Sequence, residues 1–247
     1  MRLRFRFSIV PFIATVALVV LGIVLGNWQA RRAEEKTALQ AHLLERGSAP
    51  PLRLGHVAID PAAVEYRRVV ATGRFVRDWP VYLDNRPLGG HEGRSGFVLL
   101  MPFKIAAADN TYVLVARGWF PRDPGAHDRI PALPVPEGEQ TIEGIAVPRP
   151  ARVMQLGTAP PLAPHAIVQN LEVADVARAS GLAMLPFLVE QTGNPAYAPD
   201  GLVRQWPAPA LDVDRHRGYA FQWYALAAMA CVFFVMTGFR RGRQTAG

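Results

Sequence analysis

The sequence predicts a membrane protein of α+β class, in which two transmembrane α-helices flank a mainly antiparallel β domain of sandwich or barrel type. Three observations support this class: an uncharged apolar run near each end, arginines outside both runs, and a middle region of short β-rich segments separated by turn residues. The chain has 247 residues, of which 50% are hydrophobic, so material for a buried core is ample.

The first apolar run covers residues 9–26, "IVPFIATVALVVLGIVLG". At about 1.5 Å per residue, a helix of this length comes close to crossing a hydrocarbon core of about 30 Å. A cleaved signal peptide is the alternative, but the run exceeds the usual apolar region of about 7–15 residues and no A-x-A site follows it. We therefore expect an uncleaved anchor, whose helix continues beyond the bilayer to a stop at Gly47.

The second apolar run covers residues 219–238, and Gln222 is its only strongly polar member. Two spans place both chain ends on the same side of a membrane. Gly22 and Gly26 form a G-x-x-x-G pattern in the first span, and small residues recur in the second. Small residues let helix backbones approach closely, so the spans are expected to pack on each other or on a partner's helices.

The positive charge lies mainly at the chain ends. Six arginines lie outside the two apolar runs: Arg2, Arg4, Arg6, Arg240, Arg241 and Arg243. Of the 27 basic residues, 21 remain without these six, against 20 acidic residues, so the interior offers no basic face for nucleic acid. The positive-inside rule instead predicts that both termini are cytoplasmic.

The expected organisation follows from this topology. In a bacterium, the chain would lie in the inner (plasma) membrane with its central domain in the periplasm. The segments are residues 1–8 (cytoplasmic), 9–26 (first span), 27–218 (extracytoplasmic β-rich domain), 219–238 (second span) and 239–247 (cytoplasmic).

The central region reads as a series of short strands with one late helix. Gly, Pro, Asp and Asn clusters separate the β-rich runs, and little room remains for crossover helices. We therefore expect a mainly antiparallel sheet curled into a sandwich or barrel. The expected strands are residues 66–76, 81–86, 96–105, 112–120, 140–147, 165–170 and 185–191, and the expected helix is 171–181.

The common signatures of catalysis and metal binding are absent from the sequence. It contains no G-x-S-x-G, H-E-x-x-H, P-loop, G-x-G-x-x-G or C-x-x-C pattern. The sequence has one cysteine, Cys231, which lies in the second apolar run. Because it is single, an intrachain disulfide and a cysteine-rich metal site are excluded. These absences favour a protein that is not an enzyme, although distant carboxylates could still be paired by folding.

One histidine differs from the other five by its position beside a span. If the second helix begins shortly before Tyr219, then His216, Tyr219, Ala220 and Trp223 line one helix face at the membrane surface. An amphiphilic ring that carries a metal could dock there, with its iron bound by His216 Nε2. The alternative is an interfacial histidine that only anchors the helix beside an aromatic belt.

The acidic groups of such a ring would need basic partners. The helix ends offer Arg215 and Arg217 beside the histidine, and Arg31 and Arg32 beyond the first span.

Four motifs carry a resemblance to a known family. They are "GNWQARRAEEK" with Gly26, Trp28, Gln29, Arg32 and Lys36; "VLVARGWFP" with Arg117, Gly118, Trp119 and Pro121; "GLVRQWPAP"; and the H-x-x-Y-A-x-x-W pattern from His216 to Trp223. In this order and between two spans, they make the sequence similar, over essentially its whole length, to the surfeit-locus family of cytochrome c oxidase assembly factors. The chain departs from the family at two places. The family often has asparagines just before the histidine, where this chain has Asp214 and Arg215, and an asparagine before the arginine–glycine–tryptophan, where this chain has Ala116.

The resemblance implies a bacterial assembly factor that binds haem A or delivers it to the catalytic subunit of the oxidase. It implies His216 as axial ligand of the haem iron. From their positions beside it at the membrane surface, we expect Tyr219, Trp223, Arg32 and Trp28 to be further cofactor-binding residues. The implied partners are the catalytic oxidase subunit, haem A synthase and membrane lipid. The alternative is a membrane scaffold for oxidase subunits that binds no cofactor. Within the arginine–glycine–tryptophan turn, we expect Gly118 to adopt a backbone angle forbidden to its neighbours.

Overall fold

The computed structural model describes residues 5–55, 60–87, 95–126, 128–155, 157–193, 200–206 and 212–244. The chain divides into two compact units, one formed by Met1–His42 with Pro209–Gly247 and the other by Leu43–Ala208. Each is considered by itself. Arg2, Arg4, the last residues of the "GLVRQWPAP" motif, and the side chain of Arg243 lie outside the described residues.

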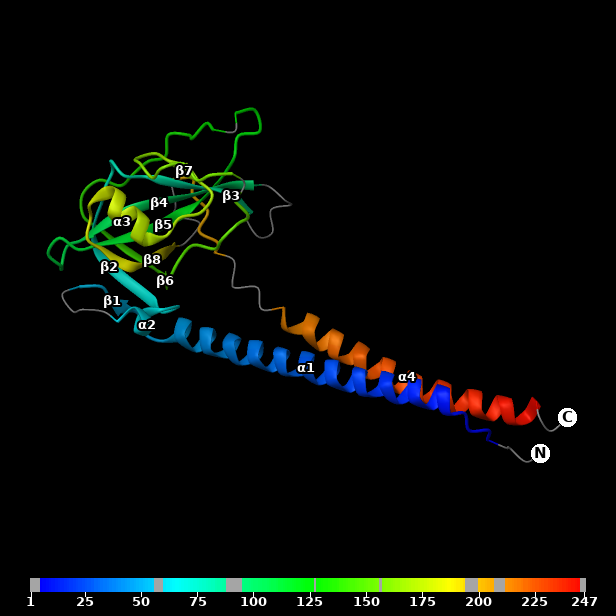
Figure 1. Cartoon of the computed structure of the whole chain (residues 1–247). Helices are drawn as coiled ribbons and strands as arrows, with labels where there is room; N and C mark the ends of the chain where they lie inside the picture. The colour runs from blue at the N-terminus through cyan, green and yellow to red at the C-terminus, as the bar shows by residue number, and fades with distance from the viewer. Residues whose placement is uncertain are drawn as a thin grey trace. The chain divides into compact units, whose positions relative to one another are not determined.

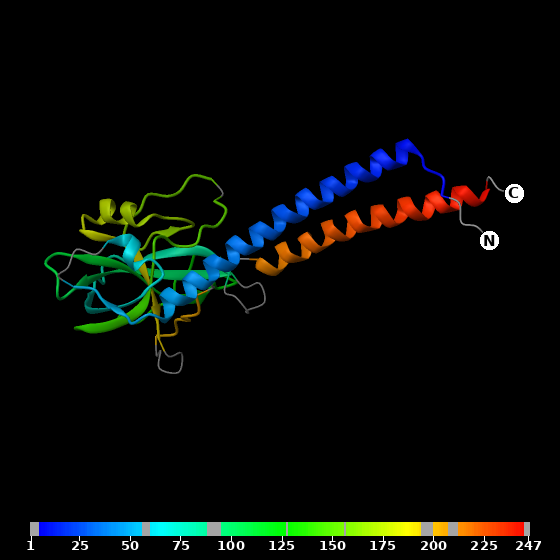
Figure 2. The same cartoon turned by 90° about the horizontal axis from the view of Figure 1, so that it is seen from below.

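The first unit is a pair of long helices, α1 (Ile9–Ser48) and α4 (Val213–Gln244). They run side by side in opposite directions (Figures 1 and 2). Both are long and apolar enough to cross a membrane. The expected extension of the first helix beyond its apolar run is confirmed, and α4 begins ahead of its apolar run, so His216 lies within the helix.

The glycines of α1 are where the two helices approach most closely. A Cβ atom at Gly22 would lie 2.8 Å from the Trp223 carbonyl oxygen and 2.9 Å from Ala227 Cβ. A Cβ atom at Gly26 would lie 2.5 Å from the ring of Tyr224. The G-x-x-x-G pattern therefore serves packing of the two spans on each other, the first of the two expected arrangements.

A phenylalanine cluster joins the other end of the helix pair. The backbone N–H of Arg6 donates to the Gly238 carbonyl at 3.1 Å, and the ring of Phe5 packs edge-on against Phe234 and Phe239 at 5.9 and 5.4 Å. The start of α1 and the end of α4 therefore lie at the same end of the pair, as two antiparallel spans require.

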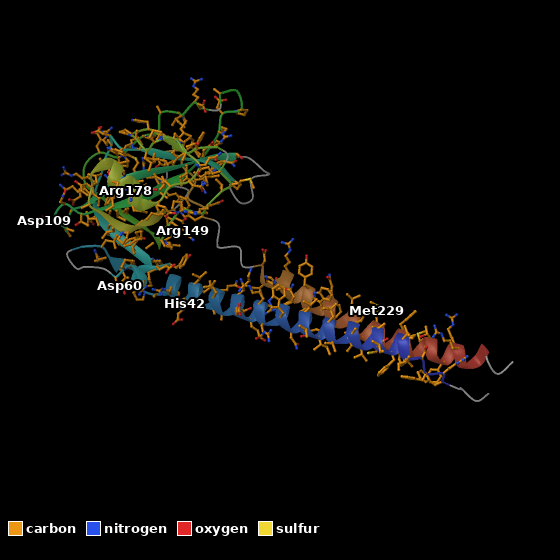
Figure 3. All side chains as sticks on the ribbon, viewed as in Figure 1. His42, Asp60, Asp109, Arg149, Arg178 and Met229 are labelled. Atoms are coloured by element: carbon orange, nitrogen blue, oxygen red, sulfur yellow. The ribbon has the colours of Figure 1, made fainter. Side chains whose placement is uncertain are left out.

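Apolar side chains cover the outside of the helix pair over the two apolar runs. Side chains project along its whole length, and Met229 is one of them (Figure 3). Phe221 and Phe233 are 73% and 70% exposed, and many other apolar residues of both helices are exposed as well. Such a continuous apolar surface suits a hydrocarbon environment rather than water.

The second unit is a β-barrel with short helices. Its strands are β1 (Leu52–Arg53), β2 (Arg68–Phe75), β3 (Val81–Pro87), β4 (Ser95–Ile105), β5 (Tyr112–Pro121), β6 (Gln140–Val147), β7 (Ile167–Val168) and β8 (Met184–Thr192). Its helices are α2 (Pro61–Val64) and α3 (Val173–Ser180). The seven expected strands and the expected helix are all present, close to their expected bounds, and β1 and α2 are additional.

The sheet closes on itself. Its order runs β1-β2-β6-β8-β5-β4-β3-β7, and β2 also pairs with β4, so β2, β6, β8, β5 and β4 form a ring (Figure 1). Most neighbours are antiparallel, which confirms the expected class. The pairs β1–β2, β3–β7 and β5–β8 are parallel, so the sheet is mixed.

Closure depends on a glycine where β2 meets β4. Gly73 pairs with Ile105, and a Cβ atom at Gly73 would lie 1.9 Å from the backbone oxygen of Lys104. No side chain fits in this space without separating the strands. The glycine that looks like an interruption of a strand is therefore what lets the barrel close.

The strands bury both of their faces. One face points into the barrel and forms the inner core, to which β4 contributes Phe97, Leu99, Met101 and Phe103. The alternate residues Val98 and Leu100 point outward into a second core, the outer core, which α3 covers with Val173 and Val176. These two cores explain why the middle strands read as nearly continuous apolar runs instead of alternating ones.

Candidate functional site

His216 lies in the first turns of α4 and faces α1. Its Nδ1 atom lies 2.7 Å from Oε1 of Gln29. An amide oxygen only accepts, so Nδ1–H is the donor and the lone pair of the neutral imidazole is on Nε2. Within the described part of the chain, Nε2 has no hydrogen-bond partner. The contact thus fixes the imidazole orientation and tautomer and leaves one nitrogen able to bind a metal.

A second polar contact joins the helices close by. The Tyr224 hydroxyl donates to Oδ1 of Asn27 at 2.7 Å. Both contacts lie at the end of the apolar runs where charged residues take over, as in "NWQARRAEEK" and "DRHRGY". Hydrogen bonds between paired helices at a membrane boundary add to the van der Waals contact of the glycines.

The structure separates the residues predicted around the histidine. Ala220 is buried against α1, whereas Tyr219 is 42% and Trp28 51% exposed. Trp223 is partly buried. The guanidinium of Arg32 lies 2.8 Å from Glu35 on the same helix, and both side chains are more than half exposed. Tyr219 and Trp28 therefore offer exposed rings, while His216 is held in the seam, the contact between α1 and α4.

Gln29 is the residue that sequence reasoning did not assign to the site. The available signal was its position: Gly22, Gly26 and Gln29 follow the i, i+4, i+7 spacing of one helix face. Because the glycines mark the packed face, the glutamine on that face had to meet the second helix.

Basic side chains flank the seam without being buried in it. Arg31 follows Gln29 by two residues, and Arg215 and Arg217 adjoin His216; all three are exposed. The nearest acid to Arg217 is Asp214, at 3.8 Å and almost fully exposed, which is a weak pair. The surroundings of the histidine therefore carry cations that remain available to an anionic group.

The arginine–glycine–tryptophan motif lies in the barrel unit, where it forms a β-bulge. Leu99 pairs with Gly118 and Leu100 with Ala116, so Arg117 is an extra residue in β5. A one-residue insertion reverses the alternation of a strand. As a result, Trp119 packs in the outer core and Phe120 in the inner core.

The Arg117 guanidinium is buried among specific partners. It lies 3.1 Å from Asp200 Oδ2, 3.1 Å from the Pro134 carbonyl and 5.0 Å above the Phe75 ring. Arg204 shares the same carboxylate. Burial lowers the pKa of Arg117, and the Asp200 charge opposes that effect. A buried arginine held by a carboxylate, a carbonyl and a ring is a structural anchor.

The "GLVRQW" segment, residues 201–206, meets this motif directly. Trp119 and Val203 exchange two backbone hydrogen bonds of 2.8 Å. Gly118 has φ of +155°, and a Cβ atom there would lie 2.7 Å from Leu202 Cβ, so the expected special backbone is present. The indole of Trp206 donates to the Gln191 carbonyl at 2.8 Å. The late segment is thus fastened to strands β5 and β8 of the barrel, although it lies 80 or more residues after the arginine–glycine–tryptophan motif in the sequence.

Glu190 on β8 is a largely buried carboxyl that the sequence did not single out. It pairs in register with Ala116 and Ile145, whose side chains belong to the outer core. Among the described residues, its carboxyl group has neither a hydrogen bond nor an ion pair. Burial raises its pKa to about 7. The pKa of Tyr66 is raised mainly by burial, and then by the charges of Glu65 and Glu190.

No protein metal centre is found in the described residues: nowhere in them do three or more His, Cys, Asp or Glu side chains gather. A metal that carries its own ligands, as in a porphyrin, needs only one protein donor. His216 Nε2 satisfies that requirement.

The comparisons with known proteins cover both units. The model of the SURF1 family matches residues 16–228, a range that includes Gln29 and His216. A SURF1-like protein of Rickettsia bellii is 26% identical over 220 residues, which is 89% of this chain and 86% of the relative. A SURF1-like protein of Drosophila melanogaster is 29% identical over 217 residues, 83% of this chain and 69% of the relative. The cytochrome oxidase assembly protein SHY1 of Saccharomyces cerevisiae is 28% identical over 176 residues, 69% of this chain and 44% of the relative.

Proposed function

The chain belongs to the SURF1 family, and from this membership we propose that it is a non-enzymatic assembly factor for cytochrome c oxidase. The name of the yeast relative supports the role in assembly. The missing catalytic motifs support the non-enzymatic part. The catalytic oxidase subunit, haem A synthase and membrane lipid are its partners in this proposal, and the Rickettsia relative agrees with a bacterial member.

The proposed task is to hold haem A as cargo and pass it to the catalytic oxidase subunit. The hydrogen bond between His216 Nδ1 and Gln29 Oε1 carries this proposal, because it leaves Nε2 as an oriented donor for the iron. The exposed ring of Tyr219 offers a face for the porphyrin, and Arg215 or Arg217 can meet its carboxylates.

The position of the histidine suits a cargo with two kinds of surface. Burial of each methylene of the isoprenoid tail contributes about 0.8 kcal/mol, so the tail favours the bilayer. The carboxylates favour water and cations. A ligand at the end of an apolar helical run lets the iron bind while the tail stays in lipid and the carboxylates stay outside.

The proposed location is the inner membrane, with both termini in the cytoplasm and the barrel in the periplasm. Two apolar helices with basic residues beyond their outer ends support it, among them the described Arg6, Arg240 and Arg241. His216 then lies at the periplasmic boundary.

The test is the pigment of the full chain purified in detergent from cells that make haem A. A pyridine haemochromogen spectrum should show haem A in the unaltered protein and none in His216→Ala. Gln29→Leu should retain the ligand but weaken binding by about 10–100-fold, because the imidazole loses its orienting partner. Tyr224→Phe is the matched control, since it removes the other hydrogen bond between the helices and leaves the imidazole untouched.

The possible outcomes distinguish haem binding through His216 from the cofactor-free scaffold and from an effect of helix pairing alone. Haem A retained in His216→Ala would refute the ligand assignment. Absence of haem A from the unaltered protein, together with co-purified oxidase subunits, would favour the cofactor-free scaffold. Loss of pigment in Tyr224→Phe as well would mean that helix pairing, and not the imidazole, controls binding.

A further inference from the structure

A cavity lies within the second unit, beside the inner core of the barrel. Its volume is about 440 Å³, inside the range of about 300–1,000 Å³ that small-molecule sites occupy. Its wall includes Tyr82 from β3 and Leu99 and Met101 from β4, which belong to the inner core. The cavity therefore borders the apolar interior of the barrel rather than its outer surface.

Segment 128–135 of the β5–β6 connection forms the other wall. It contributes the partly buried Ile130, Leu133 and Val135, all of which pack on the inner core. The segment is fastened at its end, because the Pro134 carbonyl accepts from Arg117 at 3.1 Å and Glu137 lies 2.8 Å from Arg77. An apolar wall held by polar contacts is typical of a preformed pocket.

Tyr82 supplies a polar group that has no hydrogen-bond partner among the described residues. The residue is only 7% exposed and its ring packs edge-on against Phe120 at 6.2 Å. Its hydroxyl forms no hydrogen bond with any described residue, and it is not among the polar atoms sealed from solvent. The hydroxyl therefore faces the cavity. Because the hydroxyl is open to the cavity, it is free to donate to, or accept from, a polar atom of an occupant.

His165 marks the rim with an unusual backbone. It has φ of +65°, which a residue other than glycine adopts at a cost of about 1 kcal/mol. Its N–H donates to the Pro80 carbonyl at 2.7 Å, and its ring lies 6.4 Å from that of Tyr82. The backbone thus holds an imidazole beside the phenol at the opening of the cavity.

The charges at the cavity favour neither an anion nor a cation. The lining contains one basic and one acidic side chain, Arg77 and Asp128, and both are exposed, so neither sign of charge is in excess. We propose that this cavity binds a neutral, largely apolar molecule with one hydroxyl or carbonyl oxygen, which hydrogen-bonds to the Tyr82 hydroxyl. The proposal is independent of haem binding at His216, which belongs to the other unit.

The experiment is photo-crosslinking of the full chain in lipid nanodiscs with three decyl probes, each carrying a diazirine in its chain. The probes differ only in their head groups: an alcohol, a carboxylate and an amine. Mass spectrometry of the labelled peptides then locates the cross-links. The alcohol should label the peptides that contain Tyr82, Met101 and Leu133, and excess unlabelled decanol should suppress this labelling. The charged probes should label the same peptides more weakly.

Three variants make the result specific. Tyr82→Phe should lower labelling by the alcohol about fivefold, the effect of one hydrogen bond. Ala132→Phe, at an exposed position of the lining, should fill the cavity and abolish labelling. Tyr112→Phe is the matched control on β5, outside the lining, and should leave labelling unchanged.

Three results would overturn the proposal. Labelling that persists in Ala132→Phe would place the probe in bulk lipid or elsewhere on the protein. Equal or stronger labelling by the carboxylate or the amine, or an unchanged yield in Tyr82→Phe, would contradict recognition of a neutral oxygen by the phenol.

Discussion

The buried carboxyl of Glu190 predicts a specific effect of pH on the stability of the barrel. Burial raises its pKa from 4.5 to about 7, so the folded chain holds this proton more tightly than the unfolded chain. At a pH below the pKa of Glu190 in the unfolded chain, both states are protonated and the carboxyl group does not change the stability. It destabilises progressively between pH 4.5 and about 7, and by a constant amount above that.

The magnitude follows from the interval between the two values. A tenfold change in proton affinity corresponds to about 1.4 kcal/mol, so the ionised Glu190 costs about 3 kcal/mol at pH 8. Glu190→Gln keeps the size of the side chain and stays neutral. It should therefore match the unaltered protein at pH 4 and exceed its stability by up to about 3 kcal/mol at pH 8. For a unit of this size, the difference corresponds to about 6–12 °C in the midpoint of thermal unfolding.

The assay is thermal unfolding of the full chain in detergent, followed by tryptophan fluorescence between pH 4 and pH 8. Only the difference between variant and unaltered protein is interpreted, because the other titrating groups are shared. Glu143→Gln is the control: it removes the same charge from an exposed position on the adjacent strand β6 and should leave the midpoint unchanged. A difference for Glu190→Gln that is constant with pH, or a loss of stability at pH 8, would refute the reasoning.

Three other substitutions test the packing. Gly73→Ala should destabilise the barrel by about 3 kcal/mol or more, because its methyl group would meet the backbone oxygen of Lys104; a chemical denaturation curve measures the loss. Asp200→Ala should cost about 3–5 kcal/mol in the same assay, since it leaves the buried Arg117 without its anion. Gly22→Leu should separate the membrane helices, and spin labels on the two helices should then report a longer and broader distance.

Much of the architecture could be predicted because it depends on local patterns. Uncharged runs, arginines beside them and turn residues between β-rich segments are all properties of neighbouring residues. They were sufficient for both spans, for the seven strands and for α3. The presence of His216 near the start of a helix also followed from its distance to the apolar run.

The contacts that define the site were not available from such patterns. Gln29 and His216 are 187 residues apart, and nothing in the local sequence of either specifies the other. The same holds for Arg117 and Asp200, 83 residues apart. Pairing partners in a sheet depend on register and on long connections, which periodicity does not encode.

The bulge at Arg117 shows a second kind of limit. A uniform alternation along β5 places Trp119 on the same face as Val113 and Val115, whereas the extra residue sends it to the other face. The parallel pairing of β5 with β8 was likewise missed, because strand direction is set by the path of the connection through α3 rather than by the strands themselves.

The continuous burial of β4 has a consequence for the newly made chain. All residues from Gly96 to Phe103 are buried in the folded barrel. Before folding, this stretch is therefore an exposed apolar segment of eight uncharged residues. Aggregation-prone segments of this kind are usually interrupted or bordered by proline or charge, and here Pro102 and Lys104 hold those places. We therefore expect these two residues to limit aggregation during biogenesis, and their replacement by valine to reduce the yield of soluble intermediates before it alters the finished fold.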